Sequence, residues 1–249
     1  MRVYGRVLTS EWRKLGKSSI WLLVLVGPLL STLLGSLDLE GVANENEKWL
    51  GLFLNMASGQ GLLFLPLFTG IFAAFVCRYE HLDGGWKQLM ALPVRRTAVY
   101  FAKLTLVLIL VAAMQLLFLG FYLGGGKLLG LSLGSLPWQT VLGGIGGGLL
   151  GALPIAALQL AVSVGWTSFA GPLSLNVMLT IPNVLVVNSK DFSPWYPWAQ
   201  PFMAMMPRIA GHETFAALNL SLSTVLIVIA GGTILFLASG LFYFNRKEM

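Results

Sequence analysis

The chain has 249 residues, of which 56% are hydrophobic and only 10% are charged, whereas soluble globular domains carry about 25% charged residues. This composition excludes an ordinary water-soluble domain, and a chain of this length that holds several spans of roughly 20 residues each has little left for a separate catalytic domain. The formal net charge of +6 does not indicate a nucleic-acid partner, because Lys and Arg accumulate in the cytoplasmic loops of membrane proteins.

The first 18 residues predict an amphipathic helix. Apolar side chains recur at helical spacing along one side of the segment, and the basic side chains project mainly from the other. The apolar set is Val3, Tyr4, Val7, Leu8, Trp12 and Leu15, and the basic set is Arg2, Arg6, Arg13, Lys14 and Lys17. We expect this helix to lie in the cytoplasmic membrane interface with its apolar face toward the lipid; the alternative is a flexible basic tail.

Six apolar segments are long enough to cross a bilayer. The first, about residues 19–37, is longer than the apolar region of a secretory signal and has no A-x-A cleavage site after it, so we expect it to stay as a span. The other five are about 55–76, 98–123, 138–164, 168–188 and 219–244. The stretch between Lys127 and Lys190 has no charged residue and is too long for one span. The sequence therefore predicts an all-α polytopic membrane protein with six transmembrane helices in a single domain, residues 1–249.

A run of glycines, GGIGGGLLG at 143–151, lies within the fourth predicted span. It places small residues at helical spacing, which allows membrane helices to approach closely and to pack by van der Waals contact. A phosphate-binding loop would instead need a strand before the glycines and a helix after them. We therefore expect close helix packing at this run and find no nucleotide site in the sequence.

Residues 189–218 contain four prolines that are too close together for one continuous helix. We expect a broken external segment that re-enters the interface between the fifth and sixth spans. Trp195, Tyr196 and Trp198 lie in this segment. They predict either an aromatic gate that contacts an amphipathic substrate or an aromatic belt that holds the loop at the outer interface.

An even number of spans places both chain ends on one side of the membrane. Most of the 16 Lys and Arg residues then lie on that side as well. The exceptions are Lys48, Lys127, Lys190 and Arg208. Because basic residues accumulate on the cytoplasmic side, we expect both chain ends and the loop 78–97 to be cytoplasmic.

The predicted spans carry almost no ionisable side chains. Lys103 is the exception, and we expect it to extend its ammonium from the cytoplasmic end of the third span to the interface. Transporters that couple to protons or ions usually have ionisable residues inside their spans, so ion-coupled transport is disfavoured. Cys77 is the single cysteine, and the spans hold no Ser-His-Asp set, no carboxylate pair and no metal-ligand cluster. We expect no catalytic residue and no metal site.

The loop 78–97 concentrates charge between two apolar spans. Its segment WKQLMALP predicts two turns of helix that stop at Leu92, because the residue before a proline is disfavoured in the helical conformation. The apolar face of this helix carries Trp86, Leu89 and Met90, and its polar face carries Lys87, Gln88 and Ala91. A helix this short is marginal alone, so it needs the headgroup layer or a protein partner to fold against.

The same loop resembles the cytoplasmic loop of ABC-2 type exporter permeases. The residues that carry the resemblance are Glu80, Gly85, Trp86, Lys87, Leu89, Leu92, Pro93, Arg96, Tyr100 and Lys103. The layout is also similar to that family: an interfacial N-terminal helix, six spans, this loop between spans two and three, and a broken external segment. The sequence SPWYPWAQP at 193–201 resembles the external segment of the lantibiotic-immunity and bacitracin-resistance branch.

The resemblance implies a permease in the bacterial cytoplasmic membrane that binds two separately encoded ABC ATPase subunits and pairs with a second permease, identical or paralogous. ATP and Mg²⁺ would be bound by the ATPase chains, with no cofactor in this chain. The ATPase-coupling residues would be Glu80, Gly85, Trp86, Lys87, Leu89, Pro93 and Arg96. We expect Trp86 and Leu89 to provide the apolar anchor, and Glu80 and Lys87 to make charge-assisted contacts with the ATPase. The implied substrates are amphipathic peptides, antibiotics or lipids.

Other functions are alternatives. A lipid or drug exporter of the same superfamily would keep the coupling loop and change only the substrate. A membrane scaffold or sensor subunit would use the basic loop to recruit a regulator. A secondary transporter or a channel is disfavoured by the scarcity of charge in the spans.

Overall fold

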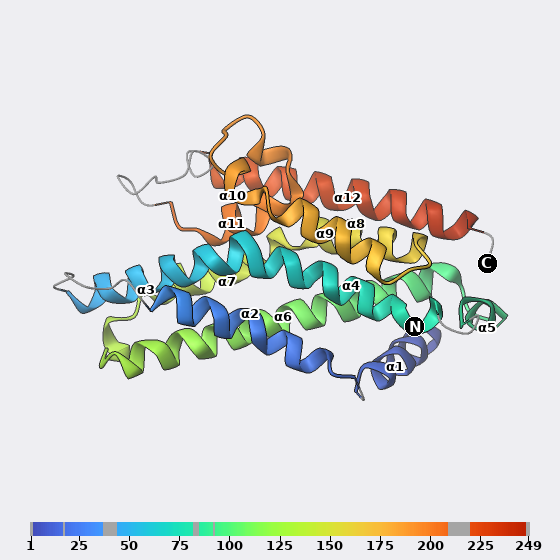
Figure 1. Ribbon diagram of the computed structural model, residues 1–249, viewed down its shortest axis with the longest axis horizontal. Coiled ribbons are helices and arrows are strands. Elements are labelled where there is room, and N and C mark those ends of the chain that lie inside the picture. Colours follow the sequence, from blue (N-terminus) through green and yellow to red (C-terminus); the bar gives the residue numbers. More distant parts are fainter. Residues whose placement is uncertain are drawn as a thin grey trace.

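The computed structural model describes residues 2–16, 18–36, 44–81, 85–91, 93–208 and 220–247. Within these residues every regular element is a helix or a helical turn. The long helices run roughly along the longest axis of the molecule and pack as one bundle (Figure 1). The predicted all-α fold class is confirmed.

The first half of the chain forms α1 (Arg2–Gly16), α2 (Ile20–Gly35), α3 (Glu45–Gly59), the π-helical turn η1 (Gln60–Phe64), α4 (Leu65–His81), α5 (Gly85–Ala91) and α6 (Arg96–Leu128). The second half forms η2 (Leu133–Ser135), α7 (Trp138–Gly151), α8 (Leu153–Gly165), α9 (Ala170–Thr180), α10 (Asn183–Val186), η3 (Ser193–Trp195), η4 (Pro197–Ala199), α11 (Gln200–Met205) and α12 (Leu222–Arg246).

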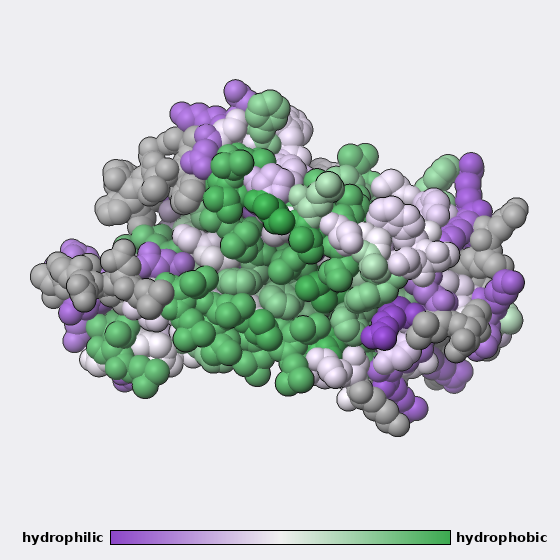
Figure 2. Space-filling view, viewed as in Figure 1, coloured by the Kyte–Doolittle hydropathy of each residue, from purple (hydrophilic) through white to green (hydrophobic). Residues whose placement is uncertain are grey.

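Four helices are long and apolar enough to cross a membrane. They are Glu45–His81, Arg96–Leu128, Trp138–Gly165 and Leu222–Arg246. The pair α1 and α2, bent by 73° at the break between them, counts as a fifth if the two helices form one span. Apolar side chains cover the middle of the visible face, and polar ones gather toward its two ends (Figure 2). The chain is thus a multi-pass membrane protein.

The predicted count of six spans is not reproduced, because the fifth one is too short. Where residues 168–188 were expected to cross the membrane, the structure has the 11-residue helix α9 and the four-residue helix α10. Pro182 stands between them and has no backbone N–H to continue the hydrogen-bond ladder of α9. The apolar stretch from Ala170 to Val186 therefore stays below the length that a bilayer crossing needs.

The two ends of the bundle differ in what they hold. α1, α5 and the C-terminal end of α12 gather at one end of the long axis, and the start of α3 lies at the other (Figure 1). We call the first the α5 end and the second the opposite end. The first helix, α1, and the C-terminal end of the last helix, α12, thus lie at the same end of the molecule (Figure 1).

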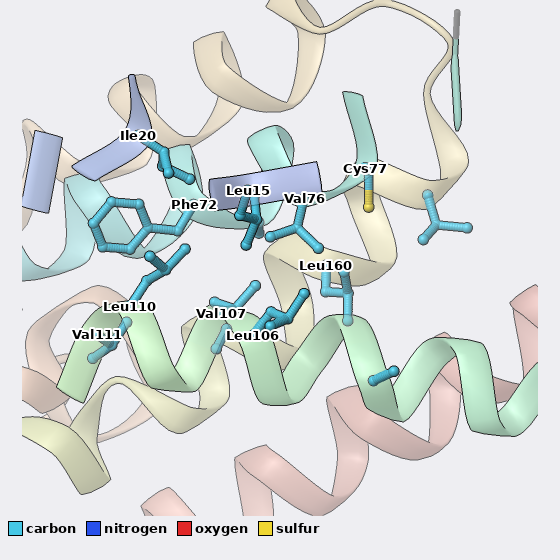
Figure 3. Close-up of a cluster of buried hydrophobic side chains, with 14 of the residues drawn as sticks. Leu15, Ile20, Phe72, Val76, Cys77, Leu106, Val107, Leu110, Val111 and Leu160 are labelled. Atoms are coloured by element: carbon cyan, nitrogen blue, oxygen red, sulfur yellow. The ribbon is translucent and has the colours of Figure 1, made fainter. Parts of the chain in front are cut away.

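The apolar core at the α5 end joins helices that are distant in sequence. Leu15 of α1, Phe72 and Val76 of α4, and Leu106 and Leu110 of α6 point toward one another (Figure 3). All five are at most 3% exposed to solvent. Lipid chains are as apolar as these side chains, so the contacts within the spans stabilise mainly by van der Waals packing. This core fixes α1 on the bundle rather than leaving it as a tail.

The glycine run of α7 forms the close helix contact that its spacing predicts. A Cβ atom placed on Gly147 would lie 1.9 Å from the Ala204 carbonyl oxygen, and one on Gly151 would lie 2.6 Å from the Pro201 Cα. The partner helix is α11, in which every residue is buried. The proline-rich segment is therefore broken, as predicted, and its helical part is wedged into the bundle; residues 209–218 of that segment lie outside the described residues.

Candidate functional site

Helix α5 is the amphipathic helix that the loop sequence predicts. It ends at Ala91, before Pro93, and it exposes Lys87 and Gln88 while Trp86 is only 7% exposed. Leu89 is half-buried and packs on the core at the α5 end. The Met90 side chain and Leu92 lie outside the described residues. The inner face of α5 thus rests on the protein's own helices, a surface that sequence analysis did not consider.

Trp86 ties α5 to two other helices. Its indole Nε1 donates a hydrogen bond to His81 Nδ1 of α4 at 3.3 Å. Its ring centroid lies 5.5 Å from that of Phe244 in α12, in an edge-to-face arrangement, which is a favourable geometry for aromatic pairs. The Lys103 ammonium of α6 lies over the indole ring, 5.5 Å from its centroid, and makes a cation–π contact with it. One side chain of α5 therefore contacts α4, α6 and α12.

Beside Trp86 lies a cluster of four charges, formed by Glu11, Lys14, Glu80 and Lys103, of which all but Lys14 are buried. The Lys103 ammonium donates to Glu11 Oε2 and to Glu80 Oε2, both at 2.7 Å, and to the Val76 carbonyl at 2.8 Å. Lys14 donates to Glu80 Oε1 at 2.6 Å and also to Glu11. We call this set the four-charge cluster. Two ammonium groups balance two carboxylates, so the cluster is neutral as a whole.

The four-charge cluster joins three helices. Glu11 and Lys14 belong to α1, Glu80 to α4 and Lys103 to α6. The side chains of Lys103, Glu11 and Glu80 are 1–2% exposed. Buried charges are costly unless each is paired and hydrogen-bonded, and here every carboxylate oxygen has an ammonium partner. The three helices are therefore held in one register.

Two expectations change at this cluster. Lys103 does not extend to the interface, because carboxylates from α1 and α4 bind its ammonium inside the protein. Glu80 faces the same interior, so in this structure its carboxylate contacts lysines of its own chain rather than a partner protein. Glu11 was missed by sequence analysis. The signal was present, since Glu11 lies four residues from both Val7 and Leu15 on the inward stripe of the N-terminal helix.

The remaining coupling residues lie around α5 in different settings. Pro93 is exposed, whereas Gly85 lies close against α4: a Cβ there would be 2.9 Å from the Tyr79 carbonyl oxygen. The Arg96 guanidinium donates to the carbonyls of Phe244, Asn245 and Lys247 at 2.9–3.3 Å. Arg96 thus caps the C-terminal end of α12, where a cation is favourable.

Lys247 makes a second cap beside the first. Its ammonium donates to the carbonyls of Val164 and Gly165 at the end of α8, at 2.8 Å and 3.1 Å. Burial lowers the pKa of this ammonium below its ordinary value. The ends of α8 and α12 are therefore linked to each other and to the start of α6.

At the opposite end, the three predicted aromatic residues do not form one exposed surface. Trp195 is 76% exposed, whereas Trp198 is 3% exposed and donates from Nε1 to Asn176 Oδ1 at 2.9 Å. The Tyr196 hydroxyl donates to the Leu179 carbonyl, and burial raises its pKa. Only Trp195 is free to contact a molecule outside the protein.

Comparison with known families decides the identity of this arrangement. A sequence profile described as ABC-2 family transporter protein matches residues 7–183 of the chain. The chain belongs to the ABC-2 transporter family. No curated protein sequence matches it individually.

Membership makes this ABC-2 protein the membrane component of a transporter and implies partnership with an ABC ATPase. The matched range includes most of α1, all of α5 and all members of the four-charge cluster. It ends before Trp195, Tyr196 and Trp198 and before α12. In the described part of this ABC-2 protein there is no group of three or more His, Cys, Asp or Glu side chains that could hold a metal ion. What the arrangement offers is mechanical: a short helix attached to three long ones, α4, α6 and α12.

Proposed function

We propose that this chain is the permease subunit of an ATP-driven exporter and that α5 is the helix on which a separate ABC ATPase acts. One observation carries the proposal: the polar face of α5, with Lys87 and Gln88, is exposed, while Trp86 binds its inner face to α4, α6 and α12. A push on the exposed face would therefore reach three long helices through one side chain.

In this proposal the coupling residues divide into two roles. Lys87 and Pro93 are exposed and would contact the ATPase, with charge-assisted contacts at Lys87. Glu80, Gly85, Trp86, Leu89 and Arg96 would act as positioning residues, because their described partners belong to this chain. The sequence analysis expected Glu80 and Trp86 to contact the ATPase directly. In this proposal they instead hold the contact surface in place.

The complete exporter would contain two ATPase subunits and two permeases, the second identical to this chain or paralogous to it. The ATPase chains would bind ATP and Mg²⁺. The α5 end would face the cytoplasm of a bacterial cell, which fits the excess of basic residues in α1, in the loop 78–97 and at the C-terminus. The four-charge cluster would then lie near the cytoplasmic surface.

Lys87→Glu is the test of the docking face. The substitution reverses a charge on the exposed side of α5 and touches none of the contacts of Trp86. We expect the amount of ATPase subunit recovered with the permease to fall about tenfold or more. A tenfold change corresponds to ~1.4 kcal/mol of binding free energy. The measurement is co-purification of the neighbouring ATPase from detergent extracts, followed by its nucleotide turnover.

Arg13→Glu provides the matched control, since it reverses an exposed charge of α1 at the same end of the bundle. Recovery should stay near the wild-type level in this variant. Equal recovery in Lys87→Glu and in the wild type would contradict α5 as the docking helix. A recovered complex that moves no peptide with ATP in reconstituted vesicles would favour a scaffold or sensor subunit instead.

We further propose that the substrate is an amphipathic peptide antibiotic of the lantibiotic or bacteriocin kind, which the exporter removes from the membrane for self-protection or resistance. The support is the resemblance of residues 193–201 to that branch and the exposure of Trp195 at the opposite end. A large aromatic side chain at this place can bind the apolar face of such a peptide. A lipid or a drug is the alternative substrate of the same superfamily.

Trp195→Ala is expected to lower protection against the peptide by about fivefold to tenfold, because one exposed aromatic contact contributes on the order of 1–1.5 kcal/mol. Trp138→Ala is the control: Trp138 is also exposed, at the start of α7, and should leave protection unchanged. The measurement is the inhibitory concentration of the peptide for cells that contain equal amounts of each variant in the membrane. Full protection in Trp195→Ala would argue against a substrate contact at this residue.

A further inference from the structure

A second feature at the α5 end shares only His81 with the contacts described so far. A cavity of about 360 Å³ lies between α4, the end of α8 and the start of α9. Arg78 and His81 of α4, Ser163 of α8, and Thr167, Ser168 and Phe169 of the connection contribute to its wall. This volume is within the range of small-ligand sites, which is about 300–1,000 Å³.

Arg78 gives the cavity its charge. Its guanidinium carbon lies 5.8 Å from the ring centroid of Phe75 and 5.7 Å from that of Phe169. Contacts with ring faces use none of the five N–H donors of the guanidinium. Arg78 forms no ion pair with any residue that the structure describes, because Glu80, its neighbour on α4, is bound within the four-charge cluster. Arg78 is exposed, and none of its N–H donors has a hydrogen-bond partner among the described residues.

Hydroxyl groups line the same cavity. Ser163 is 2% exposed, and its hydroxyl has no hydrogen-bond partner among the described residues. The Ser168 hydroxyl accepts from the Ala170 backbone N–H at 3.2 Å and keeps its own proton to donate. Thr167 adds a third hydroxyl to the wall. A buried hydroxyl without a partner is uncommon in native proteins and indicates that an acceptor belongs beside it.

The other charged and titratable groups nearby are already engaged. His81 accepts from Trp86 at Nδ1, which leaves its proton on Nε2 for the Ser163 carbonyl at 2.7 Å. Lys247 is bound to the carbonyls at the end of α8. Among the described residues, the cavity wall therefore presents a cation without an ion-pair partner, hydroxyl donors and no carboxylate. Acceptor oxygens with negative charge match this set, and the planar guanidinium binds them in a bidentate manner.

We propose that this cavity binds a phosphate group, either in the headgroup of an anionic phospholipid or as free phosphate. Arg78 would bind two of the phosphate oxygens, and the hydroxyls of Ser163, Thr167 and Ser168 would donate to the others. Phe169 and Pro172 supply an apolar rim, beside which an acyl chain can lie. The site does not depend on the proposed export activity or on its substrate.

The test compares Arg78→Gln with Arg95→Gln in the full-length protein. Arg95 is an exposed arginine at the same end of the bundle and is not part of the cavity, so both variants lose the same charge. The probes are phosphatidylglycerol, phosphatidylcholine and inorganic phosphate, added to protein stripped of lipid in detergent. Native mass spectrometry counts the bound molecules, and thermal unfolding reports the stabilisation.

We expect the wild type and Arg95→Gln each to retain one phosphatidylglycerol molecule. Retention by Arg78→Gln should be at least tenfold weaker. Phosphatidylcholine should bind little to any of the three proteins. Stabilisation of the wild type by phosphatidylglycerol alone identifies a lipid headgroup, and the same stabilisation by millimolar inorganic phosphate identifies free phosphate. Equal retention in Arg78→Gln and Arg95→Gln overturns the proposal, as does the absence of any effect of the phosphate compounds. If Arg78→Gln does not fold, Arg78→Lys is measured in its place. Phosphatidylglycerol or phosphate binding by Arg78→Lys that is as tight as in the wild type contradicts the bidentate contact.

Discussion

Replacing Lys103 with methionine is expected to lower the free energy of unfolding by about 3–5 kcal/mol, the usual cost of removing one partner from a buried ion pair. The reason is that Glu11 and Glu80 are buried and would share the single remaining ammonium of Lys14. Methionine fills much of the same volume, so the loss reflects charge rather than a cavity. Thermal unfolding in detergent measures the effect.

Two controls separate charge from packing. Lys87→Met makes the same substitution on the exposed face of α5 and should change stability by no more than about 0.5 kcal/mol. The double variant Lys103→Met with Glu80→Gln removes one charge of each sign and leaves the Glu11–Lys14 pair. We expect it to be more stable than Lys103→Met alone, a non-additive result that only coupled residues give. Additive losses would show that the four charges do not act together.

Gly147→Ala is the second substitution with a large expected effect. The new Cβ would lie 1.9 Å from the carbonyl oxygen of Ala204 and 2.6 Å from its carbonyl carbon. These are backbone atoms of α11, which cannot move aside as a flexible side chain does, so α7 and α11 have to separate. Overpacking of this kind costs about 1–3 kcal/mol and sometimes more, and the displaced α11 should also lower export.

The neighbouring glycine provides the control. Gly146 is in the same helix, and a Cβ there would have nothing within 4 Å. Because alanine is favoured over glycine in helices by about 1 kcal/mol, Gly146→Ala should unfold at the same temperature as the wild type or slightly higher. The prediction fails if Gly147→Ala and Gly146→Ala unfold at the same temperature.

The short helix α5 could be predicted from local sequence, but its partners could not. The spacing of Trp86 and Leu89 and the stop before Pro93 depend on neighbours in the chain, which periodicity detects well. The surfaces that receive Trp86 belong to α4, α6 and α12, the last of them through Phe244. No local pattern contains that information.

The four-charge cluster was harder to predict for the same reason. Glu11 on an apolar stripe and Lys103 inside a span were each visible as exceptions to a pattern. Their pairing depends on α1 folding back beside α6, across 92 residues of sequence. The external aromatic residues show the same limit, since spacing alone does not reveal that Trp198 faces Asn176 while Trp195 faces outward.

The predicted count of six spans is not confirmed, and the difference lies where composition was used without geometry. Residues 168–188 are apolar enough for a crossing, but Pro182 divides them into α9 and α10. The glycine run of α7 was read correctly as a place of close approach. Its partner, α11, comes from a segment that was predicted to be broken and to re-enter the interface, but its contact with α7 was not predicted.

The four-charge cluster also constrains the order in which the protein is made. Ribosomes complete α1 long before α6, so the Glu11 carboxylate emerges 92 residues ahead of Lys103. Until then a buried Glu11 would face only Lys14 of its own helix, and burying poorly compensated charge is costly. We therefore expect the nascent α1 to stay in the aqueous layer at the membrane surface. The arrival of Lys103 then provides the second partner of Glu11 and allows α1 to be fixed against α4 and α6.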